Sequence, residues 1–267
     1  MIKIPKMFMG KPIEGSLDGI SRKQVRDPPQ NPGSSQPQTL NVPAVVNPRE
    51  YIRVGVNGIY GQPVLISSYE LQGTNGLNYE NAHKKVLQSG LYVPTPRIFM
   101  AHFINVVGAK RNTIQLAYAD GASVPDAEVK EMYQHLTRNY RDVFGQNNPV
   151  AWTWLNAKFI GASLETIVGL NTDGSLKTAV ESMSSHINED CFVALNFNSH
   201  GFPVQKAAQQ EYNAGENVYF YHPCDGCVAR FLASSVGAYL DCDWGPTDAD
   251  PSLGVFACAE GAAQKNP

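Results

Sequence analysis

The stretch VARFLASSVGAYLDCDWGPTDADPSLGVFACAEG, residues 228–261, carries the clearest signal for fold and function in this sequence. From His222 to Ala259 the chain contains no Lys, Glu, Gln, Met or Asn, although all five occur elsewhere. Exposed loops normally use Lys and Glu heavily. Burial is a poor explanation, because unpaired buried carboxylates are costly and Arg230 is the one cation of the segment. We therefore expect the five aspartates to face solvent: Asp225, Asp241, Asp243, Asp248 and Asp250.

The chain before this segment divides into an arm and a folded body. Residues 26–48 are rich in Pro, Gln, Ser and Asn, and proline suits neither a helix interior nor a central strand. We expect an extended proline-rich N-terminal arm over residues 1–49 and one folded domain over residues 50–267.

Hydrophobic periodicity within the body predicts strands at both ends and helices between them. Ile52, Val54 and Val56 alternate with small or polar residues, as in a half-buried strand. Further strands are predicted at residues 63–71, 191–197, 218–222, 228–232 and 253–258. Three helices are predicted to start at Asn78, at Thr95–Pro96 and at Asp126. This order predicts an α+β fold, in which strands from either side of the helices meet in one central antiparallel sheet.

The C-terminal stretch resembles the variable region of proteins that diversity-generating retroelements diversify. Three upstream stretches, FMAHFINVV (99–107), AWTWLNAKF (151–159) and VYFYHP (218–223), look like the nanoarchaeal, and so archaeal, branch of these variable proteins. Residues 253–256 resemble the closing strand of their C-type-lectin-like fold. The resemblance spans about residues 50–261 and leaves the proline-rich arm unexplained.

The resemblance implies a non-enzymatic display protein with a C-type-lectin-like fold and a loop-rich variable face at about residues 222–252. Such retroelements rewrite adenines, and an Asn codon changed in this way never encodes Lys, Glu, Gln, Met or Trp. The segment fits this alphabet except at Trp244, which we assign to the fixed scaffold. The implied partner is a variable macromolecule, such as a protein on another cell or a virus. Neither calcium-binding tripeptide of sugar-binding C-type lectins, Glu-Pro-Asn or Trp-Asn-Asp, occurs, so calcium-dependent sugar binding is not carried over.

Side-chain chemistry divides the segment into fixed and exchangeable positions. Burying a large apolar side chain contributes roughly 1.5–3 kcal/mol, whereas changing a small polar loop residue typically alters stability by about 0.5 kcal/mol or less. The predicted framework is Phe231, Leu232, Tyr239, Leu240, Trp244, Pro246, Pro251, Leu253 and Val255. The predicted variable, ligand-binding positions are Cys224, Asp225, Gly226, Ser235, Val236, Gly237, Asp241, Asp243, Gly245, Asp248, Ala249, Asp250 and Ser252. Tyr239 and Trp244 would add contact area at the rim if they are exposed.

A zinc-dependent enzyme is the main alternative. His222, Cys224 and Cys227 are close in sequence, and Pro-Cys-x-x-Cys occurs in zinc deaminases. A deaminase also needs His-x-Glu, and no histidine here has Glu two places on. A fourth zinc ligand is not evident. We therefore predict no cofactor or metal at these residues.

Other catalytic signatures are weak. The run from Asp241 begins like a calcium loop, but Pro246 stands where an EF-hand needs Gly and Ser252 where it needs Glu. Neither a Gly-x-Ser-x-Gly motif nor a Walker-type phosphate loop occurs. We therefore predict no catalytic residues.

Composition narrows the partner and the setting. The net charge of −3 and the 17% content of charged residues argue against nucleic-acid binding. No apolar run approaches the roughly 20 residues of a membrane span, and residues 1–10 lack the apolar core of a secretory signal. Five cysteines, an odd number with irregular spacing, suggest mainly free thiols. A structural viral or surface-layer subunit, with the arm wrapping a neighbour, remains a further alternative.

Overall fold

The computed structural model describes residues 47–59, 61–137, 151–234 and 237–260, together with the backbone of two short strands. Contacts divide the chain into two units, Met1–Pro37 and Gln38–Pro267. The first unit contains β1 (Met7–Phe8), paired antiparallel with β2 (Lys11–Pro12). The predicted arm otherwise lies almost entirely outside the described residues. Within the described part of the chain, no helix is both long and apolar enough to cross a membrane.

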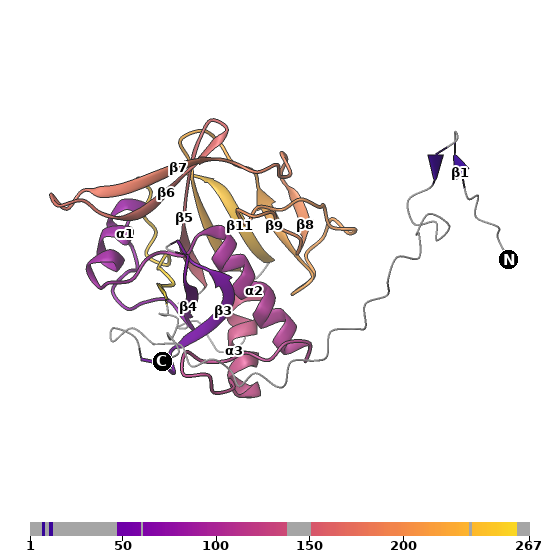
Figure 1. Ribbon diagram of the computed structural model, residues 1–267, viewed down its shortest axis with the longest axis horizontal. Helices are drawn as coiled ribbons and strands as arrows, with labels where there is room; N and C mark the ends of the chain where they lie inside the picture. Colours follow the sequence, from indigo (N-terminus) through magenta and orange to yellow (C-terminus); the bar gives the residue numbers. More distant parts are fainter. Residues whose placement is uncertain are drawn as a thin grey trace, which may run out of the picture. The chain divides into compact units, whose positions relative to one another are not determined.

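A seven-stranded sheet forms the body of the second unit (Figure 1). Its strand order is β7-β6-β5-β10-β11-β9-β8, and every neighbouring pair is antiparallel except β11 and β9, which run parallel. The strands are β5 (Trp152–Ile160), β6 (Ser163–Leu170), β7 (Leu176–Ser182), β8 (Cys191–Ala194), β9 (Asn217–Tyr221), β10 (Val228–Ser234) and β11 (Gly237–Trp244).

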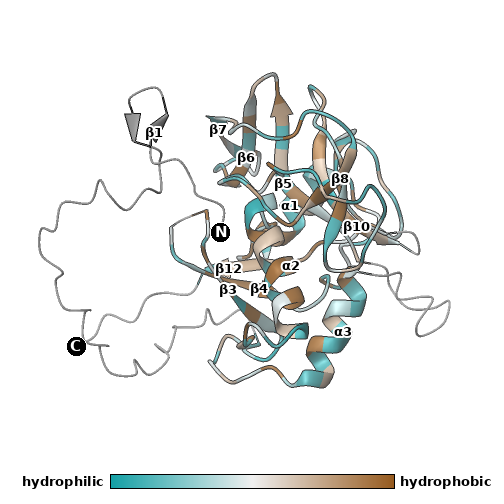
Figure 2. Ribbon diagram, turned by 90° about the vertical axis from the view of Figure 1, so that its right-hand side faces the viewer, coloured by the Kyte–Doolittle hydropathy of each residue, from teal (hydrophilic) through white to brown (hydrophobic). Residues whose placement is uncertain are grey.

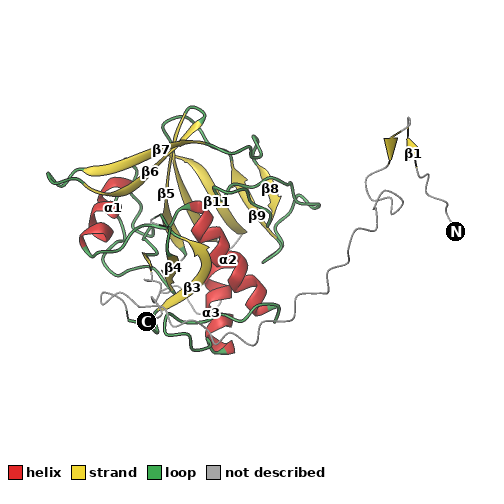
Figure 3. Cartoon of the chain, viewed as in Figure 1, coloured by secondary structure: helices red, strands yellow, loops and turns green. Residues whose placement is uncertain are grey.

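A second, three-stranded sheet joins the two ends of this unit. It consists of β3 (Tyr51–Asn57), β4 (Pro63–Ser67) and β12 (Cys258–Glu260), in the order β12-β4-β3. Both pairings are antiparallel, with Cys258 opposite Ile66 and Ile52 also opposite Ile66. The fold is α+β with three helices among the described residues (Figure 3), as predicted. The prediction of one central antiparallel sheet is wrong: within the described ranges, strands from before and after the helices meet only in the small sheet, and the large sheet is separate and contains one parallel pair.

The helices begin where the capping residues predict. In α1 (Tyr79–Gln88) the Asn78 side chain accepts a hydrogen bond from the Asn81 N–H, and in α2 (Pro96–Lys110) Thr95 caps Ile98 in the same way. Helix α3 (Asp126–Thr137) starts at the predicted residue, and the positions beyond Thr137 lie outside the described residues.

Helices α2 and α3 pack on one face of the large sheet. The Phe99 ring of α2 lies 4.8 Å from that of Phe231 on β10, and the Phe103 ring lies 5.6 Å from it. Helix α2 is mainly hydrophobic in Figure 2, whereas α3 carries long polar sections. One face of the large sheet is therefore buried beneath these helices, and alternate residues of its strands point to the opposite face.

The predicted strand at residues 253–258 is wrong for most of its length, since β12 begins only at Cys258. In residues 255–257, just before β12, side-chain hydroxyl oxygens accept the backbone hydrogen bonds in place of a neighbouring strand. The N–H groups of Val255, Phe256 and Ala257 donate to the hydroxyls of Thr74, Thr153 and Ser67, respectively. These bonds fix a fully buried, irregular segment below the C-terminal loops.

Candidate functional site

The face of the large sheet opposite α2 and α3 carries a row of aromatic side chains. On β9 the buried Val218 and Phe220 alternate with the half-buried Tyr219 and Tyr221. On β11 the buried Ala238 and Leu240 flank the half-buried Tyr239, and on β8 Phe192 is half-buried in the same way. We call Phe192, Tyr219, Tyr221 and Tyr239 the aromatic row.

Ring contacts make the aromatic row continuous across three strands. Tyr219 lies 4.9 Å from both Phe192 and Tyr221, measured between ring centroids. Tyr239 lies 6.1 Å from Tyr219 and 6.3 Å from Tyr221, and the rings of Tyr239 and Tyr221 are nearly parallel, at 18°. Half-buried tyrosines offer a large rigid contact area together with a polar hydroxyl, and such side chains are enriched at interfaces.

Tyr219 and Tyr221 of the aromatic row are neutral hydrogen-bond donors. Burial raises the pKa of Tyr219, and nearby Asp190 adds to the rise. Burial also raises the pKa of Tyr221, as do the neighbouring tyrosines. Each phenol therefore keeps its proton at neutral pH.

Arg230 and Asp241 form a buried ion pair beside the row. They are opposite each other in the β10–β11 register, and their side chains are only 7% and 3% exposed. The guanidinium donates from Nε and Nη2 to Asp241 Oδ2 at 2.9 and 2.7 Å. It also stacks on Trp244, 3.2 Å from the ring centroid, and lies 5.7 Å from the centroid of Trp152. The pair fixes the end of β11 to β10 and holds Trp244 in place.

The expectation that Asp241 faces solvent is therefore wrong. One arginine cannot neutralise five aspartates, but it suffices for one carboxylate directly across the strand pair. Burial and a hydrogen bond with Asp243 raise the pKa of Asp241 to about 7, while Arg230 opposes the rise. Burial likewise lowers the pKa of Arg230, against the attraction of Asp241, Asp243 and Asp250. The hydrogen bonds of this guanidinium to a carboxylate are those to Asp241.

Gly237 is the second predicted variable position that is buried. A Cβ atom there would lie 3.3 Å from the ring of Tyr212, so a larger side chain has little room. Ser235 and Val236, which precede it, lie outside the described residues.

The remaining variable positions lie at the surface. Cys224, Asp225, Gly226, Asp243, Asp248 and Ala249 are exposed, whereas Gly245, Asp250 and Ser252 are half-buried. Of the predicted framework, Phe231, Leu232, Leu240, Leu253 and Val255 are buried, Tyr239, Trp244 and Pro246 are half-buried, and Pro251 is exposed. Pro251 is thus the one exposed member of the predicted framework, and the half-buried Tyr239 and Trp244 are partly accessible at the surface.

The turn between β9 and β10 is closed by a disulfide. Cys224 and Cys227 are bonded, with their Cα atoms 5.4 Å apart, and are the exception to the expectation of mainly free thiols. The other three cysteines are free and buried. Asp225 accepts a hydrogen bond from the Gly161 N–H at 2.8 Å, and Cys224 Sγ lies 4.0 Å from the Asp243 carbonyl oxygen. The turn therefore sits between β11 and the β5–β6 connection.

The zinc-enzyme alternative does not fit this geometry. A disulfide sulfur has no thiolate to offer a metal. His222, the third candidate ligand, instead has its Nδ1 atom 2.6 Å from Asp190 Oδ1. Burial alone would raise the pKa of Asp190, but hydrogen bonds from the backbone and ring of His222 lower it. Within the described ranges, no group of three or more His, Cys, Asp or Glu side chains is arranged to hold a metal ion.

A cavity of about 530 Å³ lies beside the disulfide turn. Its walls include Met183, His186, Pro223, Cys224 and Asp225. Two predicted variable positions, Cys224 and Asp225, thus line a hollow as well as the open surface.

Comparisons with known proteins identify no relative. No family model, curated protein or solved structure matches this chain. The fold and the surface therefore define an α+β protein with an open aromatic and acidic sheet face, and its function has to be inferred from that face.

Proposed function

We propose that this is a non-enzymatic binding protein that recognises a macromolecular partner through the open face of its large sheet and the adjoining C-terminal loops. The observation that carries the proposal is the continuity of two surfaces. The aromatic row ends at Tyr221 and Tyr239, and the register places Tyr221 beside Asp241, two residues before the exposed Asp243. Aromatic anchors bordered by exchangeable polar residues are typical of recognition surfaces.

The shape of the surface favours a macromolecule over a small substrate. The row spans three strands, and its members are half-buried on an open sheet face. Small-molecule sites are typically concave and bury most of their ligand. A protein on another cell or on a virus is the kind of partner that a broad face of this type fits.

We further propose that the domain is C-type-lectin-like and belongs among the variable proteins of retroelements. Pairing of β12 with β4 supports the first part, because it closes the domain by joining its last described strand to one from its start. Six exposed variable positions support the second part, since they lie on a frame whose large apolar residues are mostly buried.

The gene neighbourhood tests the diversification directly. We expect a near-copy of the coding segment for residues 222–252 beside a reverse transcriptase gene. The two copies should differ mainly at adenines, in codons for exposed residues such as Asp225, Asp243 and Asp248. Codons for Arg230 and Asp241 should match, because the buried pair tolerates no exchange of one partner. Absence of the copy, or differences concentrated at the buried pair, would contradict this proposal.

A further inference from the structure

Strand β7 is an unprotected edge of the large sheet. Among the residues that the structure describes, its residues LKTAVES pair only with β6, and Lys177 through Ser182 are all exposed. Val180, a β-branched apolar residue, is 59% exposed. In Figure 1 β7 runs along the upper margin of the domain. A strand edge of this length is a template for pairing with another strand unless something covers it.

The register shows which backbone groups of β7 are free. Met183 donates to the Ala162 carbonyl at 3.0 Å, and the register continues with Glu181 opposite Leu164 and Ala179 opposite Thr166. In an antiparallel ladder, alternate residues direct their N–H and C=O groups to the same neighbour. Residues 179 and 181 therefore bond to β6, whereas residues 178, 180 and 182 direct their backbone groups outward.

We propose that β7 binds β7 of a second copy of this chain, antiparallel and centred on Ala179. A two-fold axis at Ala179 places Thr178 opposite Val180 of the second copy, so their outward groups exchange hydrogen bonds. It also places Lys177 opposite Glu181 of the second copy, and Glu181 opposite Lys177. These are non-hydrogen-bonded pairs, in which cross-strand side chains lie closest.

Charge selects this register among those the backbone allows. A shift of the pairing by one residue would set outward backbone groups of one copy against inward backbone groups of the other, so the pairing shifts only by two residues at a time. The two-fold axis can therefore lie at Thr178, Ala179 or Val180. A centre at Thr178 places Lys177 opposite Ala179, and a centre at Val180 places Glu181 opposite Ala179. The centre at Ala179 alone among these three gives two opposite-charge pairs, and an isologous contact repeats each pair by symmetry.

The dimer has a defined architecture. Two seven-stranded sheets join at β7 into one continuous sheet, with β8 as the last strand at each end, where residues 205–207 bond to its outer side. Each copy of the aromatic row lies near a β8 edge, so the two rows are held far apart on one assembly. A contact through short strands is small, which predicts a reversible dimer.

Sedimentation equilibrium of the full chain tests this proposal. The wild type should show a concentration-dependent monomer–dimer equilibrium at up to about 100 μM protein, where weak small-interface dimers are detectable. Lys177→Glu places two acidic pairs across the axis and should raise the dimer dissociation constant about tenfold or more. Lys177→Glu combined with Glu181→Lys restores both opposite-charge pairs and should recover the dimer. Lys130→Glu, at an exposed position of α3, makes the same change in net charge as Lys177→Glu, and as the control it should leave the dimer unchanged.

A backbone variant tests the strand pairing itself. Thr178→Pro removes an N–H that points away from β6, so it should abolish the dimer while preserving the monomer fold. Glu181→Lys also removes the contact between Glu181 Oε1 and His200 Nε2, which lie 3.4 Å apart. The dimer dissociation constant of the double variant is therefore compared with that of Glu181→Lys alone. A monomeric wild type over the whole range overturns the proposal, as does a dimer that survives both Lys177→Glu and Thr178→Pro. Either result leaves the recognition surface unaffected, because that surface lies on other strands.

Discussion

Arg230 and Asp241 face each other across β10 and β11, and Asp241 Oδ2 accepts two hydrogen bonds from one guanidinium, at 2.9 and 2.7 Å. This pair sits in the segment whose surface we expect to be exchangeable, yet neither residue can change alone. It therefore separates the fixed part of the C-terminal segment from the variable part.

Removing Asp241 should destabilise the protein strongly. Asp241→Ala leaves the Arg230 charge buried and unpaired, which typically costs about 3–5 kcal/mol in the free energy of unfolding. Replacing both residues, as Arg230→Met with Asp241→Leu, should recover most of this loss because no charge stays buried. Urea denaturation measures all three proteins. Glu131→Ala, at an exposed position of α3, is the control and should change stability by about 0.5 kcal/mol or less. An equally small effect of Asp241→Ala would show that the pair does not hold the strands together.

Gly237 should reject large side chains, although the sequence places it among variable positions. Its Cβ would lie 3.3 Å from Tyr212, so Gly237→Leu should lower the free energy of unfolding by about 1–3 kcal/mol through overpacking. Ala249→Leu, at an exposed loop position, is the matched comparison and should be nearly neutral. Similar unfolding midpoints for the two variants would contradict the assignment of Gly237 to the frame.

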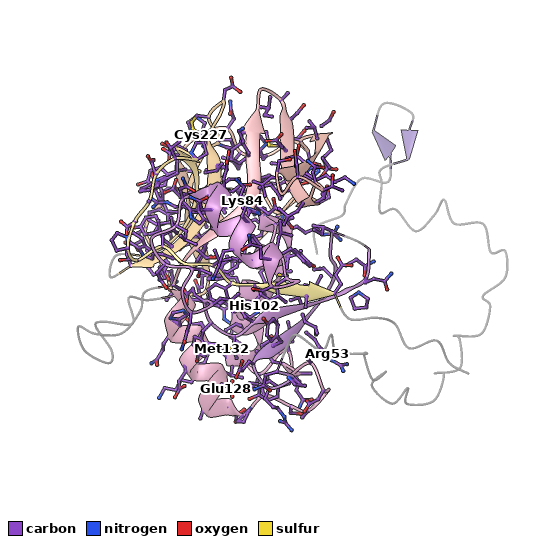
Figure 4. All side chains as sticks on the ribbon, turned by 90° about the vertical axis from the view of Figure 1, so that its left-hand side faces the viewer. Arg53, Lys84, His102, Glu128, Met132 and Cys227 are labelled. Atoms are coloured by element: carbon purple, nitrogen blue, oxygen red, sulfur yellow. A yellow bond between two sulfur atoms is a disulfide. The ribbon has the colours of Figure 1, made fainter. Side chains whose placement is uncertain are left out.

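Buried histidines should make the fold sensitive to acid. His102 is fully buried, lies near the middle of the fold in Figure 4, and has no hydrogen-bond partner at either ring nitrogen among the described residues. Burial, with a smaller contribution from His135, lowers its pKa from 6.5 to about 4. A pKa lowered by folding stabilises the fold above the unfolded pKa, and this stability is lost as pH falls toward the folded value.

The sign and size of this effect can be measured. Between pH 7 and pH 5, His102 should account for a loss of about 2 kcal/mol in the free energy of unfolding. His83, whose pKa burial lowers to about 3, should contribute in the same direction. His102→Leu should flatten the pH dependence and leave stability at pH 7 equal or higher, since two unpaired nitrogens are removed. Parallel pH profiles of variant and wild type would be inconsistent with a neutral buried His102.

The Cys224–Cys227 disulfide should add only modest stability. It closes a very short loop, for which chain entropy predicts about 2 kcal/mol at most. The turn is also held by the Gly226 N–H, which donates to the Phe159 carbonyl at 2.8 Å, and by the Asp225–Gly161 bond. Urea denaturation of Cys224→Ser/Cys227→Ser should therefore show a folded protein with a small shift in midpoint. Loss of the folded state would show that the disulfide, and not these bonds, fixes the turn.

The starts of the helices could be predicted because a capping side chain bonds to backbone groups only three residues away. Asn78 and Thr95 cap their helices by bonding to N–H groups three residues on, and Gly90 has the left-handed φ of +74° that ends α1. The alternation at Ile52 likewise marked β3 correctly. Pairing partners are not local, and β5, β6, β7 and β11 were not predicted. In β5 the side chain of the buried Asn156 binds the N–H and C=O of the distant Ile167, each at 2.7 Å.

The candidate surface was predicted in part. Exposed positions such as Asp225 and Asp248 follow from small polar residues in loops. The burial of Asp241 depends on which residue lies across the strand, which composition does not encode. The aromatic row was missed because two of its strands lie outside the C-terminal segment. Its signal was nevertheless present, since the alternation in residues 218–221 places Tyr219 and Tyr221 on the face opposite Phe220.

Site-specific photo-cross-linking tests the recognition surface most directly. In one protein a photoreactive phenylalanine analogue replaces Tyr239 in the aromatic row. In the control protein it replaces Tyr69, which is 37% exposed and whose ring contacts His135 of α3. Both proteins are exposed to cells and virus particles from the natural community of the source organism. The account predicts a discrete protein adduct at position 239 that is absent at position 69 and is lost when Tyr219 and Tyr221 are changed to Ala. Identical adduct patterns at the two positions, or an adduct at 239 that survives loss of both tyrosines, would contradict it.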